Sequence, residues 1–168
     1  IRVYLCQSVA TSELSSEKVI PMNKAFVREP DQVDSRCPRC DSAGHRVGPQ
    51  TLAAWVPEVA RKILAESAYF CPDGQCGVVY YDDFGGVVNR SFIPGPIPIK
   101  DIDAPLCACF GLTREEIEQD IDDGGVARTR AAVLRAQSSE ARCVTLAPNG
   151  RSCVPDVQGY YLKCKQRG

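Results

Sequence analysis

The sequence predicts an α+β fold, in which a small metal-bound β/α region is followed by a helical hairpin. Three observations support this class. A close pair of cysteines stands at each end of residues 37–76, and β-type runs cluster around the second pair. Residues 94–98 hold three prolines, which indicate a stiff connector. From Asp101 onward the apolar spacing is helical.

The first region carries signals for one helix and several extended runs. Pro57 suits a first helical position, and a helix over 57–66 would place Val59, Ile63 and Leu64 on one face. The predicted extended runs are residues 69–71, 78–81 and 87–93. Asp73 and Gly74 predict a turn between the first two of these runs.

The second region predicts two helices joined as an antiparallel hairpin. Thr113 and Glu116 form a capping box, and Gly124 ends the helix that follows it. A second helix over 126–137 would carry one apolar stripe, made of Ala127, Ala131 and Leu134. The first helix is acidic and the second is basic, so their flanks are expected to pair.

Ten cysteines beside a single histidine make sulfur chemistry the main question. An even number of cysteines is compatible with five disulfides in an oxidising compartment. However, residues 1–12 lack the apolar core and cleavage site of a secretory signal. Neighbouring cysteines as close as these also rarely reach disulfide geometry without strain. We therefore expect metal ligation in a reducing, cytoplasmic setting.

The first thiol set has the spacing of a structural zinc site. It comprises Cys37, Cys40, Cys71 and Cys76. Zn²⁺ held by four thiolates is tetrahedral and closed, and it supplies folding energy to a region with a thin core. Two alternatives are four buried free thiols and replacement of one sulfur by His45. The surroundings lack the Lys and Arg cluster of a nucleic-acid-binding zinc ribbon.

The second thiol set has a different, asymmetric spacing. Cys107 and Cys109 precede the first helix of the hairpin, and Cys143 and Cys153 follow the second. Four thiols gathered in this way can span the two irons of a [2Fe-2S] cluster. Backbone N–H groups at the start of the first helix and in residues 149–152 are expected to donate to its sulfurs. Such a site supports reversible one-electron transfer.

These assignments divide the chain into three parts. Residues 1–36 form an amino-terminal extension of unknown role, with a short strand expected at 2–5 and a linker after it. Residues 37–100 form the zinc-binding region, and residues 101–168 form the cluster-binding domain. Cys6 and Cys164 are expected to be plain thiols, with auxiliary copper binding or a mutual disulfide as alternatives.

Several motifs, in order, resemble the amino-terminal metal-binding domain of the CopZ family of copper chaperones. They are CPRC, YFCPDGQCGVVYYD, IPIK, CACFGLTREEI and APNGRSC. The last two also resemble BFD-like [2Fe-2S] domains, related to bacterioferritin-associated ferredoxin. The resemblance covers about residues 37–157 and implies zinc on the first thiol set and a cluster on the second. The nine residues between Cys143 and Cys153 fit the CopZ-like pattern better than the shorter BFD spacing.

The resemblance does not include the carboxy-terminal domain of CopZ-like proteins. CopZ-like proteins carry a carboxy-terminal copper-binding domain with an MxCxxC loop, whereas this sequence ends at Gly168 with only Cys164 beyond the cluster motif. We therefore do not expect copper delivery from this polypeptide. A fragment, a cluster domain that works alone, and a part of a larger redox assembly all remain open.

Three functions follow from these sites. The first is an electron-transfer module that exchanges single electrons with a redox partner protein, and the resemblance adds reduction of Cu²⁺ to Cu⁺, with a copper-handling partner, as one end use. The second is a structural or regulatory binding module in which both sites hold zinc. The third is an iron-sulfur sensor or cluster carrier, in which cluster loss is the signal.

The charge and composition of the chain limit the classes of binding partner that we expect. Lys and Arg total 20 against 21 acidic residues, which disfavours nucleic acid, and no apolar run approaches the roughly 20 residues of a membrane span. Two four-thiolate centres would move the formal charge from -1 to about -5, so we expect a partner that presents positive charge. No independent enzyme is expected, since a glycine-rich nucleotide loop is absent and Asp82 and Asp83 suit a solvated hairpin end.

Overall fold

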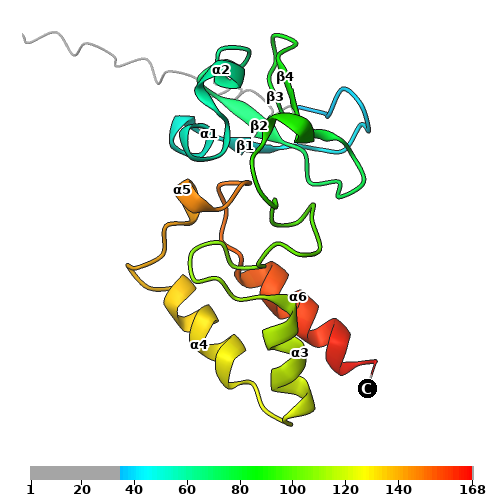
Figure 1. Ribbon diagram of the computed structural model, residues 1–168, viewed down its shortest axis with the longest axis vertical. Helices are drawn as coiled ribbons and strands as arrows, with labels where there is room; N and C mark the ends of the chain where they lie inside the picture. Colours follow the sequence, from blue (N-terminus) through cyan, green and yellow to red (C-terminus); the bar gives the residue numbers. More distant parts are fainter. Residues whose placement is uncertain (1–34, 168) are drawn as a thin grey trace, which may run out of the picture. The chain divides into compact units, whose positions relative to one another are not determined.

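The computed structural model describes residues 35–167, which contain one antiparallel sheet and a group of helices (Figure 1). The α+β class is confirmed. The strand expected at residues 2–5, the linker and Cys6 lie outside the described residues. None of the helices within 35–167 combines the length and the hydropathy that a membrane span requires.

The sheet has four short strands in the order β1-β2-β3-β4, each antiparallel to its neighbour. They are β1 (His45–Val47), β2 (Ala68–Phe70), β3 (Val78–Tyr81) and β4 (Val87–Asn89). The runs predicted at 69–71 and 78–81 are therefore confirmed within one residue. The run at 87–93 is only half strand, because a 3-10 turn, η2 (Arg90–Phe92), follows β4.

The main core cluster of this part packs on the sheet and includes part of the proline-rich segment. Phe70 and Tyr80 meet edge to face, with ring centroids 5.7 Å apart. Ile93 and Ile97 are buried in the same cluster as Val79 and Val88. The segment that leads toward the helices is thus anchored on the sheet, and the division of the chain at residue 100 stays a prediction.

The helix predicted over 57–66 is wrong in extent and in its buried face. The structure has two short helices instead, α1 (Pro49–Trp55) and α2 (Glu58–Arg61). Val59 is 82% exposed, whereas Ala60 is buried. The reason is that Leu52 of α1 already fills the core beside the sheet, so α2 has only a small side chain to bury.

Asp82 also departs from the expected solvated position. Its carboxylate is buried and accepts the backbone N–H groups of Ala65, Phe84 and Gly86. Burial alone would raise the pKa of Asp82, but these hydrogen bonds lower it below its ordinary value. Asp82 therefore holds the turn between β3 and β4, while Asp83 is exposed as expected.

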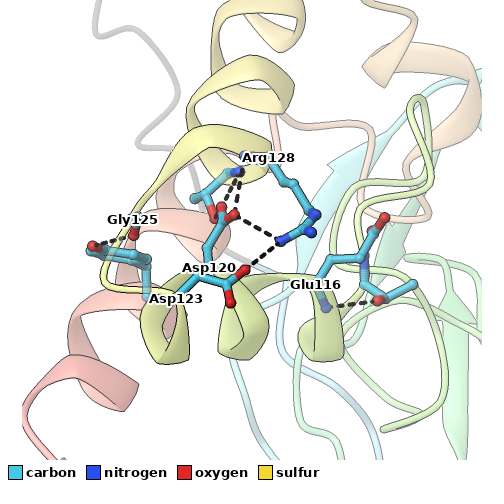
Figure 2. A network of polar contacts seen from close by, with 8 residues as sticks. Glu116, Asp120, Asp123, Gly125 and Arg128 are labelled. Carbon is cyan, nitrogen blue, oxygen red and sulfur yellow. Dashed lines mark hydrogen bonds and ion pairs between the residues drawn. The ribbon is translucent and has the colours of Figure 1, made fainter.

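The helical hairpin is confirmed. It consists of α3 (Arg114–Asp122) and α4 (Ala127–Ala136), and the capping box of Thr113 and Glu116 is present (Figure 2). Arg128 pairs with Asp120 at 3.3 Å and with Asp123 at 3.5 Å, so the acidic and basic flanks do meet. The Asp120 carboxylate also accepts the backbone N–H and the hydroxyl of Thr129 (Figure 2).

The apolar stripe predicted on α4 is wrong. Thr129, Ala132 and Ala136 are the buried residues, and Leu134 is 57% exposed. A further helix, α6 (Val154–Lys165), packs against both α3 and α4 (Figure 1). Because α6 covers this face of the hairpin, small side chains are buried there, which a two-helix arrangement does not require.

Candidate metal centres

The first thiol set comes together on the sheet. Cys37 and Cys40 lie in the turn before β1, Cys71 follows β2, and Cys76 precedes β3. The four sulfurs all lie within 4.8 Å of one another, with Cys37 and Cys76 at 3.8 Å and Cys40 and Cys71 at 3.5 Å. Two thiolates on one tetrahedral zinc lie about 3.8 Å apart, given a Zn–S bond of roughly 2.3 Å. The set therefore has the size that a single zinc ion requires.

Backbone hydrogen bonds shape both turns of this site. The Cys37 N–H donates to the Ser42 carbonyl, and the Asp41 N–H returns to the Cys37 carbonyl, each at 2.9 Å. On the other side, Lys100 donates through Nζ to the carbonyls of Asp73 and Cys76 at 2.7 and 3.1 Å. Lys100 was not a predicted site residue, although it lies in the IPIK motif.

The thiols of this set differ in acidity. The Ser42 hydroxyl, 3.4 Å from the Cys40 sulfur, lowers the pKa of Cys40 to about 7. Burial raises the pKa of Cys71 and of Cys76 above the ordinary thiol value. Without a metal these buried thiols stay protonated, so zinc binding must displace protons. His45 lies in β1 and is not one of the four gathered residues.

The second thiol set forms two close pairs. Cys109 and Cys143 approach to 3.9 Å between sulfurs, and Cys107 is hydrogen-bonded to Cys153. Within residues 35–167, only the first set gathers three or more ligand atoms as tightly as one ion requires. Two separated pairs fit a centre with two metal atoms, each held by two thiolates, better than a single ion.

The two pairs are brought together by different elements. Cys107 and Cys109 belong to a tight turn closed by a bridge from Cys107 to Leu112. Cys143 begins α5 (Cys143–Leu146), and Cys153 stands at the start of α6. All nine cysteines within 35–167 are free thiols, and Cys164 is a half-buried one on α6.

Some of the N–H groups predicted to donate to cluster sulfurs have other partners in the structure. The capping box of α3 uses the N–H groups of Thr113 and Glu116, and Gly150 and Arg151 donate to Ala147 and Asn149 within their own loop. The Cys107 sulfur is instead reached by the N–H groups of Phe110 and Cys109. A tight CxCF turn thus supplies donors of its own, and donation from the start of α3 and from residues 149–152 to a cluster stays a prediction.

The thiols of Cys107 and Cys153 differ in acidity. The hydrogen bond from Cys153 lowers the pKa of Cys107 to about 6, against the effect of burial. The same hydrogen bond, followed by burial, raises the pKa of Cys153. Arg135 adds positive charge, and its guanidinium lies 4.1 Å from the centroid of the Phe110 ring. One thiolate is thus favoured in this set before any metal is bound.

Three side chains of the sheet region hold the segment between Cys143 and Cys153. The Thr51 hydroxyl donates to the Val144 carbonyl, and the Trp55 indole N–H donates to the Leu146 carbonyl at 3.1 Å. The Tyr80 hydroxyl, which is buried, donates to the Pro148 carbonyl at 2.8 Å. Nothing in the local sequence pattern indicates that Thr51, Trp55 or Tyr80 contacts this loop. These contacts join α1 and β3 to the loop that carries two of the eight thiols.

The comparisons with known proteins agree with this geometry. Residues 34–93 match the CopZ-type family described as "Zinc binding domain". The chain is 28% identical over 120 residues to the copper chaperone CopZ of Archaeoglobus fulgidus, a match that spans 70% of this chain and 57% of that protein. It is also similar to the X-ray structure of the CopZ N-terminal domain from the same organism. That likeness has a TM-score of 0.62 at 26% identity, and it covers 74% of this chain and 96% of the solved one. The chain is therefore a homologue of the CopZ N-terminal domain, and its residues 34–93 resemble the zinc-binding domain of the CopZ type.

Proposed function

We propose that this chain is a one-electron transfer protein, with a structural zinc ion on the first thiol set and a [2Fe-2S] cluster on the second. The zinc ligands are Cys37, Cys40, Cys71 and Cys76, and the cluster ligands are Cys107, Cys109, Cys143 and Cys153. The observation that carries the proposal is the division of the second set into two sulfur pairs.

The chain's own groups suit such a cluster. The donor set is entirely sulfur, which is the set that iron-sulfur clusters use. The N–H groups of Phe110 and Cys109 and the cation of Arg135 lie around Cys107, where they would offset negative charge. When bound, a [2Fe-2S] cluster supplies reversible transfer of one electron.

The zinc ion is proposed as a structural one. Its four thiols leave no open ligand position, and three of them are buried. The site ties the turn before β1 to the two central strands, β2 and β3. The same β3 strand provides Tyr80, which holds the loop between Cys143 and Cys153. Zinc binding thus supports the region that positions the second set.

The likeness to a copper chaperone suggests what the electron is used for. One end use is reduction of Cu²⁺ to Cu⁺, in which a single electron passes to the copper ion. A redox partner protein would then restore that electron, and a copper-handling partner would receive the Cu⁺. The match covers only 57% of the length of CopZ from Archaeoglobus fulgidus. The activity of that whole protein is therefore not assigned to this chain, and the copper reduction described above is a proposal for residues 1–168.

Metal content and spectroscopy test the proposal directly. Protein purified without oxygen is expected to contain one zinc, two irons and two inorganic sulfides per chain, and to give an electron paramagnetic resonance signal after dithionite. Cys109→Ser should remove the iron and the signal, whereas Cys164→Ser should keep both. Two zincs and no iron in the wild-type protein would refute electron transfer and select a zinc-only binding module. A cluster lost in a single cycle of oxidation and reduction would favour a sensor.

A further inference from the structure

A pocket lined by positive side chains lies between the zinc-site turn and α6. We name it the basic pocket, and its volume is about 570 Å³. Its lining residues are Gly74, Gln75, Ile99, Lys100, Ile102, Arg114, Tyr160, Lys163 and Arg167. Four of these described residues are cations and none is a carboxylate. For a chain with a formal charge of -1, this is a strong local concentration of positive charge.

Two of the four cations are held in place by uncharged partners. Lys100 donates to the carbonyls of Asp73 and Cys76, and Arg114 donates through Nη1 to the carbonyls of Ile102 and Ala104. These contacts orient the side chains through uncharged partners, while the carboxylates of Asp101 and Glu115 lie close to Lys100 and Arg114 respectively. Cations that are already ordered lose little conformational freedom when an anion binds.

The other two cations are exposed, Lys163 on the last turn of α6 and Arg167 in the turn that follows it. Tyr160 and Lys163 are three residues apart and so share one side of α6, and Arg167 lines the same pocket from the turn after the helix. Arg114 stacks on the Tyr160 ring at 5.8 Å, while the Tyr160 hydroxyl is turned to Glu118. Lys163 and Arg167 therefore extend the fixed charges of Lys100 and Arg114 outward toward a partner.

The basic pocket adjoins the second thiol set. Ile99 lines this pocket, and it also lines a second hollow, whose walls include Cys109, Cys143 and Cys153. The wall of the basic pocket therefore continues, through Ile99, into the wall of the hollow that contains these thiols. A partner docked at the basic pocket would lie next to that hollow.

We propose that the basic pocket is the docking site for an acidic surface of the electron-transfer partner protein. This inference rests on the proposed function and names the partner's charge. It differs from the expectation drawn from whole-chain charge, which favoured a positively charged partner. A negative chain with a positive area next to its second thiol set would be oriented by an acidic partner so that the two redox centres face each other.

Binding of an acidic peptide tests the pocket without any need for a cluster. The probe is fluorescein-labelled hexaglutamate, measured by fluorescence anisotropy at low salt. Reversing both exposed charges, Lys163→Glu with Arg167→Glu, is expected to weaken binding about tenfold or more, since two attractive contacts become repulsive. The matched control is Arg130→Glu with Lys165→Glu, which changes the same charge on exposed sites outside the pocket. Equal losses in both double variants would overturn the proposal.

The same variants then report on electron exchange. Protein reduced with dithionite passes one electron to ferricyanide, a trivalent anion, which becomes ferrocyanide. The pocket variant should react several-fold more slowly than wild type, and the control should differ little, because Lys163 and Arg167 line the basic pocket whereas Arg130 and Lys165 do not. An unchanged rate in a pocket variant that has lost peptide binding would refute docking near the redox site.

Two further outcomes separate this proposal from others. Phosphatidylglycerol vesicles or a DNA oligonucleotide that bound through Lys163 and Arg167 more tightly than the peptide would replace the acidic protein partner with a different class of ligand. Wild-type protein that lacked iron but bound the peptide would refute the proposed function. The basic pocket would then be a binding site for acidic ligands with no role in electron transfer.

Discussion

Tyr80→Phe should loosen the loop between Cys143 and Cys153 while leaving the sheet intact. Tyr80 is fully buried, and its hydroxyl donates to the Pro148 carbonyl at 2.8 Å. Burial raises the pKa of Tyr80 far above its ordinary value, so the hydroxyl remains a donor at every practical pH. The substitution removes one oxygen and keeps the ring that packs against Phe70.

The loss of stability in Tyr80→Phe can be estimated from the Pro148 carbonyl, which loses its hydrogen-bond donor. A buried acceptor without its donor costs about 1 to 3 kcal/mol. We therefore expect the free energy of unfolding of the zinc-loaded protein to fall by about that amount. The cluster should also be lost faster, because Cys143 and Cys153 belong to the loop that Pro148 anchors.

Urea unfolding followed by circular dichroism measures the first effect, and decay of visible absorbance in air measures the second. Tyr161→Phe is the matched control, since it removes the same atom from an exposed site where the hydroxyl lies 3.4 Å from the Gly125 carbonyl. It should change stability by less than about 0.5 kcal/mol. Equal stabilities and equal rates of cluster loss in the two variants would show that the sheet does not position the loop.

Three other predictions concern single positions. Cys109→Ser should abolish visible absorbance but retain zinc and sheet structure, as metal analysis and circular dichroism would show, and loss of both metals together would contradict two separate sites. Asp120→Asn should destabilise the protein by about 1 to 3 kcal/mol at pH 7. Burial would raise the pKa of Asp120, but hydrogen bonds from Thr129 lower it, so its contribution is complete above about pH 4 and disappears as the pH falls through the folded-state value. The stability difference between wild type and Asp120→Asn in urea should therefore shrink in acid, and a constant difference would contradict the assignment. Gly150→Ala should cost more than Gly124→Ala in the same assay, because both glycines have positive φ but only at Gly150 would a new Cβ meet another side chain, the Thr51 Oγ1 at 3.3 Å. Equal costs would mean that this close approach carries no strain.

Local signals were sufficient where a short pattern determines the structure. The capping box at Thr113 and the turn at Asp73 involve neighbours only, and both are present. The cysteine pairs likewise predicted that the first thiol set comes together. Each pair lies in one tight turn, so a single loop closure between the two turns brings all four sulfurs to one site.

The sequence was insufficient where one element decides what another buries. Val59 was predicted to face the core, but α1 occupies that place through Leu52. Leu134 is exposed because α6 packs on the opposite face of the hairpin, and α6 itself was missed. The contact of Thr51 with the loop joins residues 93 positions apart, and no local pattern reveals it.

The indole of Trp55 gives this protein a built-in optical reporter. It is the single tryptophan of the chain, and its N–H is bonded to the Leu146 carbonyl, three residues from Cys143. Ultraviolet emission from this one fluorophore should shift to longer wavelength when the loop detaches and water reaches the ring. Assembly and loss of the proposed cluster could then be followed in real time in an unlabelled sample, from the intrinsic fluorescence of Trp55.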